Sequence, residues 1–147
     1  YSERGTDYVY NMERLLRKFR TAASLVPQPV LRKAAQPTRF GVIYFGSTSP
    51  AMHEALDVLQ AEGVHLDALR LRAFPFPDSV PEFIAAHEKV FVVEQNRDAQ
   101  MHSMLVNELD IDPARMVRVL HYDGTPITAR FIAGAIRKNM VWHKEYA

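Results

Sequence analysis

The most polar cluster of the sequence is Glu94-Gln95-Asn96-Arg97-Asp98-Ala99-Gln100, which directly follows an apolar run. A carboxylate and three amides, placed where a buried strand emerges, are suited to binding a ligand or orienting a catalytic group of a partner chain. The alternative is structural: Glu94 and Asn96 would satisfy the loop backbone while Asp98 caps the next helix. Both interpretations stay open, and hydrogen bonds to another subunit are the main functional variant.

A second candidate is the small polar turn Gly46-Ser47-Thr48-Ser49-Pro50, which also follows an apolar run. Backbone N–H groups at the start of a helix can hold a phosphate or a carboxylate. The turn lacks the further glycines of a dinucleotide fingerprint and the Lys-Ser/Thr pair of a P-loop, and a tight turn before a capped helix explains it equally. A small-anion or nucleotide-binding module that uses this turn is therefore one alternative function.

The segment Arg72-Ala-Phe-Pro-Phe-Pro-Asp78 contains two aromatic rings, Phe74 and Phe76, between prolines. The prolines force an extended path, so the rings must pack against another part of the protein. Core packing or a subunit contact is favoured over a platform for a cofactor.

The other reactive side chains form no recognisable constellation. The six histidines are scattered, none has the spacing of a zincin motif, and most of them are predicted to lie at the surface or at helix ends. No serine lies in a nucleophile elbow. The absence of cysteine excludes thiolate catalysis, disulfides, and iron-sulfur or thiolate-zinc ligation by this chain. The sequence therefore predicts no catalytic, cofactor-binding or metal-binding residue here.

Short apolar runs and helical stretches alternate from residue 39 onward. A chain of 147 residues, 48% hydrophobic and 24% charged, suffices for one ordinary domain. Nearly continuous apolar strands are typical of a parallel sheet covered on both faces, so the pattern predicts a three-layer α/β fold. The predicted strands are residues 40–45, 66–71, 89–94 and 116–120, and the predicted helices are residues 51–62, 79–87, 99–109 and 128–138.

The first 39 residues differ from the rest in charge. They hold eight Lys or Arg against three Asp or Glu, a net +5, whereas the other 108 hold ten against fourteen, a net −4. An apolar stripe predicts a helix from Asp7 to Leu25, and the prolines that follow predict an extended connector. The stripe consists of Tyr8, Met12, Leu15, Leu16 and Phe19.

We therefore expect a helix and linker over residues 1–38, belonging to a preceding domain, and an α/β domain over residues 39–147. A basic helix without interleaved exposed aromatics favours contact with a larger protein over nucleic-acid binding. A stand-alone interaction domain remains an alternative. The first residue, Tyr1, suggests an excised piece of a longer polypeptide, and without a signal-peptide pattern or a long apolar run we expect a cytoplasmic protein that binds no membrane.

Several segments, in this order, resemble the C-terminal domain of the alpha subunit of 2-oxoacid:ferredoxin oxidoreductases, the 2-oxoglutarate synthase branch in particular. The resemblance covers essentially the whole chain, and Ala99 stands where that family has glycine. If the backbone at this position takes a positive φ, alanine would be strained. The segments are Tyr8 or Val9 through Lys18, Val42-Ile-Tyr-Phe-Gly-Ser-Thr48, Met52-His-Glu-Ala-Leu-Asp57, Glu62-Gly63, Leu69 through Pro77, and Val92-Val-Glu-Gln-Asn96 with Gln100.

The resemblance implies a transketolase C-terminal-like domain, with helices on both faces of a five-stranded, mainly parallel sheet that has one antiparallel edge strand. Only four strands are evident in the sequence. We expect the fifth either in the tail, at Met140-Val-Trp142, or in the connector around Pro29 to Leu31.

The resemblance also implies a reaction, the reversible, coenzyme A-dependent oxidative decarboxylation of a 2-oxoacid to its acyl-CoA and CO2. Thiamine diphosphate with magnesium and an iron-sulfur cluster, which passes electrons to ferredoxin, belong to the preceding alpha domain and the beta subunit. We therefore expect this chain to hold no cofactor, to be inactive alone, and to assemble with both of those partners, while a homodimer stays open. The expected contact loops are the one with Phe74 to Pro77 and the one with residues 94–100.

Overall fold

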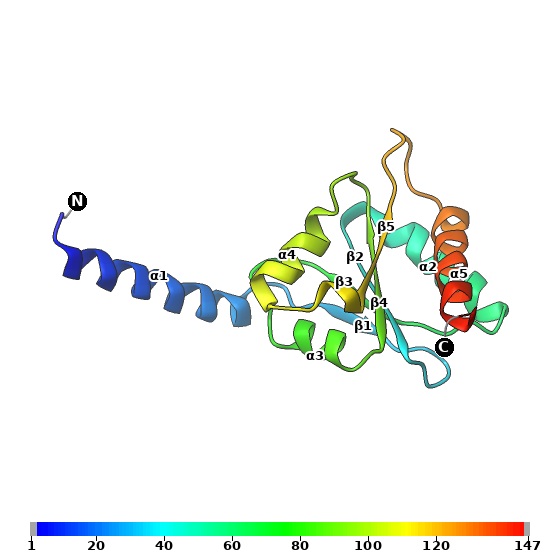
Figure 1. The fold of residues 1–147 in the computed structure, drawn as a ribbon, viewed down its shortest axis with the longest axis horizontal. Coiled ribbons are helices and arrows are strands. Elements are labelled where there is room, and N and C mark those ends of the chain that lie inside the picture. Colours follow the sequence, from blue (N-terminus) through cyan, green and yellow to red (C-terminus); the bar gives the residue numbers. More distant parts are fainter. Residues whose placement is uncertain (1–2, 146–147) are drawn as a thin grey trace.

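The computed structural model describes residues 3–145 and contains one five-stranded sheet in the order β1-β3-β2-β4-β5 (Figure 1). Strands β2 to β5 run parallel, and the short edge strand β1 runs antiparallel to β3. This confirms the predicted fold class. The strands are β1 (Val30–Arg32), β2 (Phe40–Phe45), β3 (Asp67–Leu71), β4 (Lys89–Glu94) and β5 (Met116–Leu120).

Helices cover both faces of this sheet. α2 and α5 pack together on one face, and α3 and α4 contribute to the core on the other (Figure 1). Gly63 takes a positive φ of 79° just after α2, a conformation that suits the glycine predicted to end that helix. The helices are α1 (Gly5–Leu25), α2 (Ser49–Ala61), α3 (Ser79–Ala85), α4 (Gln100–Leu109) and α5 (Ala129–Glu145), with short 3₁₀ turns at Gly46–Thr48 and Pro113–Arg115.

The core is divided by the sheet into two layers. Alternate residues of β2 point to opposite sides, so Val42 packs toward α2 and α5 while Ile43 packs toward α3 and α4. Phe91 and Val92 of β4 divide in the same way, and all four side chains are fully buried. Burial on both faces explains why these central strands are continuous apolar runs in the sequence.

The fifth strand is β1, in the connector, and Val30 pairs with Arg70 of β3. The alternative position at 140–142 is wrong, since these residues lie within α5. An edge strand tolerates the adjacent Pro29 because only one of its sides has to pair. The sheet thus includes three residues of the segment that we expected to be a linker.

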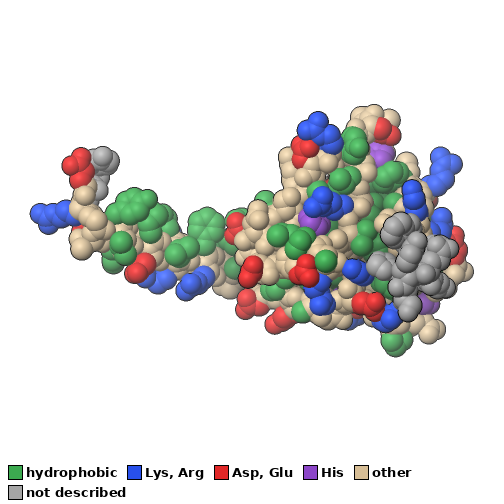
Figure 2. Space-filling model, in the orientation of Figure 1, with side chains coloured by type: hydrophobic (Ala, Val, Ile, Leu, Met, Phe, Trp, Pro, Cys, Tyr) green, Lys and Arg blue, Asp and Glu red, His purple; other side chains and the backbone are tan. Residues whose placement is uncertain are grey.

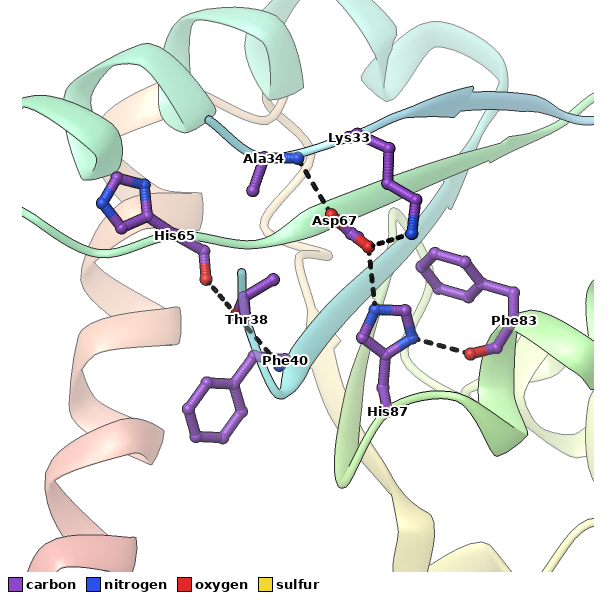
Figure 3. A network of polar contacts seen from close by, with 8 residues as sticks. All are labelled: Lys33, Ala34, Thr38, Phe40, His65, Asp67, Phe83 and His87. Atoms are coloured by element: carbon purple, nitrogen blue, oxygen red, sulfur yellow. Dashed lines mark hydrogen bonds and ion pairs between the residues drawn. The ribbon is translucent and has the colours of Figure 1, made fainter. Parts of the chain in front are cut away.

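A buried carboxylate at the amino edge of the sheet fastens the connector to the domain (Figure 3). Asp67 accepts hydrogen bonds from Lys33 Nζ at 2.6 Å, the Ala34 N–H at 2.9 Å and His87 Nε2 at 3.2 Å. The other ring nitrogen of His87 lies 2.7 Å from the Phe83 carbonyl oxygen, so the imidazole bridges Asp67 and the backbone of α3. Burial opposes ionisation, but these three donors outweigh it and lower the pKa of Asp67.

α1 extends away from the sheet domain, and none of its residues is buried (Figure 1). Its apolar side chains are open to solvent, as Tyr8 at 63% and Leu16 at 59% illustrate. Near its C-terminal end, Phe19 makes an edge contact with Phe74, with ring centroids 6.3 Å apart. The amphipathic pattern that predicted the helix is thus present, but most of its apolar face has no partner among residues 3–145.

Candidate functional site

Glu94, the last residue of β4, is fully buried at the carboxyl edge of the sheet. Its carboxylate accepts hydrogen bonds from the N–H groups of Met101 at 2.7 Å and His102 at 2.9 Å, and from Asn96 Nδ2 at 2.8 Å. Two of these donors are unpaired backbone groups in the first turn of α4, where the helix dipole also favours a negative charge. Glu94 therefore caps α4 from the end of β4. Its role is structural, but it binds the first turn of the helix, whereas the structural alternative assigned it to the loop backbone.

The remaining residues of the 94–100 loop shape the entry into α4. Asn96 Oδ1 accepts the Gln100 N–H at 3.2 Å, which leaves Ala99 as the N-cap residue with a φ of 51°. The positive φ at the position where the family has glycine is confirmed, so the methyl group of alanine is strained there. The predicted cap by Asp98 is wrong: its side chain pairs with Arg97 at 2.7 Å, because Glu94 and Asn96 already occupy the helix N–H groups.

Gln95 connects three loops at the same edge. Its Nε2 donates to the hydroxyls of Ser47 at 3.1 Å and Thr48 at 3.2 Å, and its Oε1 accepts the Ile127 N–H at 3.3 Å. The structure thus brings together two segments that the sequence analysis selected separately, the 46–48 turn and the 94–100 loop. The Gln95 side chain joins these two segments, and its hydrogen bonds stabilise the loops.

The turn at Gly46–Thr48 is a single turn of 3₁₀ helix and not an open anion cradle. Gly46 takes a φ of 58°, and its carbonyl accepts the Ser49 N–H. That N–H is used within the turn, and the hydroxyls of Ser47 and Thr48 accept hydrogen bonds from Gln95. The adjacent cleft of about 620 Å³ lies between the start of α2 and the loop before α5, and Glu54 and Arg130 place opposite charges in its wall.

His102 lies on the buried side of α4, contrary to the expectation of surface or helix-end histidines. It is 2% exposed, and its Nδ1 has no hydrogen-bond partner in the described chain. Burial lowers the pKa of His102, and the positive charge of Arg118 lowers it further, whereas Glu94 opposes the shift. The spacing to Leu105, three residues on, is a signal that could have placed His102 on the inner face.

Phe74 and Phe76 have different roles. Phe76 is 9% exposed and belongs to the core layer under α3 and α4. Phe74 is 40% exposed and lies between Phe76, with centroids 5.3 Å apart, and Phe19 of α1. A cleft of about 410 Å³ at this junction has Asp78 and Glu108 in its walls. Phe74 is therefore partly exposed and also contacts α1 through its ring.

Ser49 and His53 lie close together, but their geometry does not fit a nucleophile and its general base. Ser49 Oγ lies 3.4 Å from His53 Nε2, longer than the 2.6–3.2 Å expected of a nucleophile and its base. Among the side chains of residues 3–140, no carboxylate hydrogen-bonds to the other ring nitrogen of His53. The described residues also contain no group of three metal-ligating side chains. No helix in the described chain combines the length and hydrophobicity needed to cross a bilayer.

Comparison with known proteins agrees with this fold and extends it to a family. Residues 39–129 match the family model of the pyruvate:ferredoxin oxidoreductase core domain II. The alpha subunit of 2-oxoacid:ferredoxin oxidoreductase 2 from Aeropyrum pernix is 29% identical over 126 residues, which are 83% of this chain but 19% of that protein. The chain therefore spans about a fifth of this relative.

Solved structures share the architecture. The 2-oxoglutarate:ferredoxin oxidoreductase from Magnetococcus marinus has a TM-score of 0.82 over 93% of this chain and 24% of its own, at 21% identity. A split-gene transketolase, described as an inactive β4 tetramer, has a TM-score of 0.61 over 76% of this chain and 40% of its own, at 19% identity.

The alpha chain of a probable 2-oxoacid ferredoxin oxidoreductase from Thermoplasma acidophilum has a TM-score of 0.50 over 76% of this chain and 95% of its own, at 25% identity. These likenesses confirm the transketolase-like fold and the resemblance that the sequence motifs predicted. With more than half of its length matched, the chain belongs to the pyruvate:ferredoxin oxidoreductase core domain II family, and it is homologous to the alpha subunit of 2-oxoacid:ferredoxin oxidoreductases.

Proposed function

We propose that this chain is an assembly domain of a 2-oxoacid:ferredoxin oxidoreductase and supplies packing and subunit contacts instead of reacting groups. The observation that carries the proposal is the use of the polar groups at the carboxyl edge of the sheet. Ligands of open α/β sheets bind at that edge, but here the Glu94 carboxylate is buried in a helix cap and Gln95 is bound to loops. These side chains serve the stability of the domain.

Exposed apolar surface supports the same proposal. The stripe on α1 and the ring of Phe74 present hydrophobic area that a partner would remove from water. The partners that we propose are the thiamine-binding domain of the alpha subunit and the beta subunit. The other predicted contact loop, residues 94–100, offers Gln95 and Gln100, which are both exposed.

For the complete enzyme we propose the oxidative, coenzyme A-dependent decarboxylation of a 2-oxoacid, in the cytoplasm, with electrons passed to ferredoxin. 2-Oxoglutarate is the proposed substrate, supported by the likeness to the M. marinus enzyme, which was solved with 2-oxoglutarate, coenzyme A and succinyl-CoA bound. Thiamine diphosphate, magnesium and an iron-sulfur cluster would supply the carbanion and electron chemistry. The described residues do not fit these groups, since they contain no metal-ligating trio and the chain has no cysteine.

The proposal is tested by assaying two preparations with 2-oxoglutarate, coenzyme A, thiamine diphosphate and a viologen dye. The 147-residue chain is expected to give no turnover, and a complete enzyme of full-length alpha and beta subunits is expected to reduce the dye. Pyruvate in place of 2-oxoglutarate serves as the substrate control and is expected to react more slowly. Turnover by the chain would contradict the assembly role, and a preference for pyruvate would contradict the substrate assignment.

A further inference from the structure

The small and apolar residues of α1 recur at alternating intervals of three and four. This alternation is the heptad pattern along which one helix packs against another in a coiled coil, with two positions of each heptad forming the seam. Because α1 extends away from the domain (Figure 1) and none of its residues is buried, the seam is open. The seam consists of Gly5, Tyr8, Met12, Leu15, Phe19, Ala22 and, just past the end of the helix, Val26.

The helix also presents a hole of the shape that a coiled coil uses. A cleft of about 260 Å³ is lined by Leu15, Lys18, Phe19 and Ala22 of α1 and by Pro75 of the domain. The four helix residues are spaced i, i+3, i+4 and i+7, which is the set that surrounds one inserted side chain from a facing helix. The opening therefore fits a single side chain of a second helix, and Pro75 adds an apolar wall.

A second copy of α1 that runs antiparallel matches this seam layer by layer. When Leu15 faces Met12 of the second copy, the same register places Phe19 opposite its Tyr8. Aliphatic chains thus meet at the centre, aromatic rings meet further out, and small residues meet at the ends. Because such a pair is two-fold symmetric, each layer occurs twice. The three kinds of layer are Met12 with Leu15, Tyr8 with Phe19, and Gly5 with Ala22.

The charges of the helix favour the antiparallel arrangement over a parallel one. Residues 3–13 hold three acidic residues against one basic residue, a net −2, whereas residues 14–25 hold four basic residues and no acidic one, a net +4. Antiparallel copies place the acidic half of each helix beside the basic half of the other, and a parallel pair would bring the two basic halves together. Along the seam, Asn11 of one copy lies beside Lys18 of the other, so no like charges meet there.

We infer that two copies of this chain associate through antiparallel α1 helices, with Met12 and Leu15 at the centre and Tyr8 of each copy entering the hole beside Pro75 of the other. The inference goes beyond the proposed function, because this contact joins two alpha subunits in addition to the proposed contacts with the thiamine-binding domain and the beta subunit. Val9 and Leu16, on one flank of the seam, stay partly exposed in such a pair and are left to those partners.

The first test measures the mass of the 147-residue chain by sedimentation equilibrium over a range of concentrations. Three heptads make a weak pair, so we expect wild type to dimerise with a Kd of roughly 10–100 µM. Leu15→Asp places a carboxylate in two central layers and should weaken the dimer at least about 10-fold. Tyr10→Asp, at an exposed aromatic residue on the opposite face of α1, is the matched control and should leave the Kd unchanged. Wild type that stays monomeric at about 1 mM, or Leu15→Asp that dimerises equally well, would overturn the inference.

A second test determines the direction of the helices and does not depend on a destabilising charge. The chain has no cysteine, so engineered cysteines report only on their own positions. A mixture of chains carrying either Tyr8→Cys or Phe19→Cys is oxidised, and the covalent dimers are identified by mass spectrometry. The antiparallel pair should give the mixed disulfide in clear excess over the random proportion. An excess of disulfides between identical variants, or no more covalent dimer than Tyr10→Cys forms, would contradict the antiparallel pair.

Failure of this inference and failure of the proposed function give different results. A monomeric 147-residue chain, together with a stable complex of full-length alpha and beta subunits, would overturn the α1 pair alone. Full-length subunits that do not associate would overturn the proposed function.

Discussion

The carboxyl edge of the sheet and helix α1 use their side chains in opposite ways. At the edge, Glu94 hydrogen-bonds to the first turn of α4, and Gln95 hydrogen-bonds to two neighbouring loops of the same domain. On α1, the apolar residues that make the helix amphipathic are open to solvent, and Phe19 contacts the domain at Phe74. The polar cluster that first suggests chemistry is thus structural, whereas the plain hydrophobic stripe is the surface that lacks a partner.

The two regions also differ in net charge, because residues 1–39 carry a net +5 and the remaining residues a net −4. On the face shown in Figure 2, basic and acidic side chains lie on α1 among hydrophobic ones, and both kinds of charge are scattered over the domain. A surface that is both apolar and basic fits another protein better than it fits a small ligand. In this chain, whether a side chain already has a partner within the domain therefore indicates its function better than whether that side chain is polar.

The largest effect should come from breaking the carboxyl edge. Glu94→Ala removes the acceptor of three donors in the buried start of α4, so the free energy of unfolding should fall by roughly 3–5 kcal/mol. Glu94→Gln keeps the shape and one acceptor and should lose less. Urea denaturation measures both. Loss of under 1 kcal/mol for the alanine variant would contradict the capping role.

The second-largest effect on stability should come from Asp67, which fastens the connector between α1 and the domain. Asp67→Asn weakens the bonds to Lys33 and His87, and we expect a loss of roughly 2–3 kcal/mol at pH 7. Asp57→Asn, in a pair whose carboxylate is 67% exposed, is the control and should cost about 0.5 kcal/mol or less.

The Asp67 effect should also depend on pH. Because folding lowers the pKa of Asp67, its contribution is complete above the ordinary value of 3.8 and is lost as the pH falls through the lowered folded value. Wild type and Asp67→Asn should therefore converge in stability as the solution becomes strongly acidic. A gap that stays constant down to pH 2 would show that ionisation of Asp67 is not what stabilises the fold.

The buried His102 should make the free energy of unfolding depend on pH by a smaller amount, and at higher pH than Asp67 does. Its pKa is lowered in the folded protein, so between that value and 6.5 the unfolded chain binds the extra proton and stability falls as pH falls. From pH 7 to pH 5 wild type should lose more stability than His102→Gln does. Parallel curves for wild type and His102→Gln would contradict the assignment.

Relief of the strained loop should give the smallest change. Ala99→Gly removes a methyl group from a left-handed conformation, and we expect a gain of about 0.5–1 kcal/mol in the free energy of unfolding. Asp110→Gly, at the other end of α4 with the same φ of 51°, should gain less because aspartate tolerates this conformation better. A loss for Ala99→Gly would show that the alanine side chain contributes packing there.

Much of the sheet could be predicted from the sequence. β2, β4 and β5 have the predicted bounds, since each is a continuous or nearly continuous apolar run whose burial is visible locally. β1 could be placed only as one of two alternatives, because Val30 and Leu31 are exposed and only the pairing with β3 makes the segment a strand. Pairing depends on contacts far apart in the chain, which local patterns do not encode.

The candidate site was less predictable for the same reason. Residues 94–100 were recognised as important, but the cap on α4 comes from Glu94, seven and eight residues before the groups that it accepts. Gln95 binds hydroxyls that are 47 and 48 residues away. Local capping rules favoured Asp98 because they consider only neighbouring residues.

The central claim is that α1 serves assembly and not the stability of the domain, and one comparison tests it directly. Tyr8→Asp with Leu16→Asp places charges on the exposed stripe, and Arg14→Gln on the opposite face is the control. Full-length alpha subunits carrying each change are mixed with beta subunit, and complex formation is measured by size-exclusion chromatography with light scattering.

We expect the double variant to lose the complex while the free energy of unfolding of the 147-residue chain changes by less than about 0.5 kcal/mol. Arg14→Gln should assemble as wild type does. A double variant that assembles normally, or that unfolds the domain, would contradict the account.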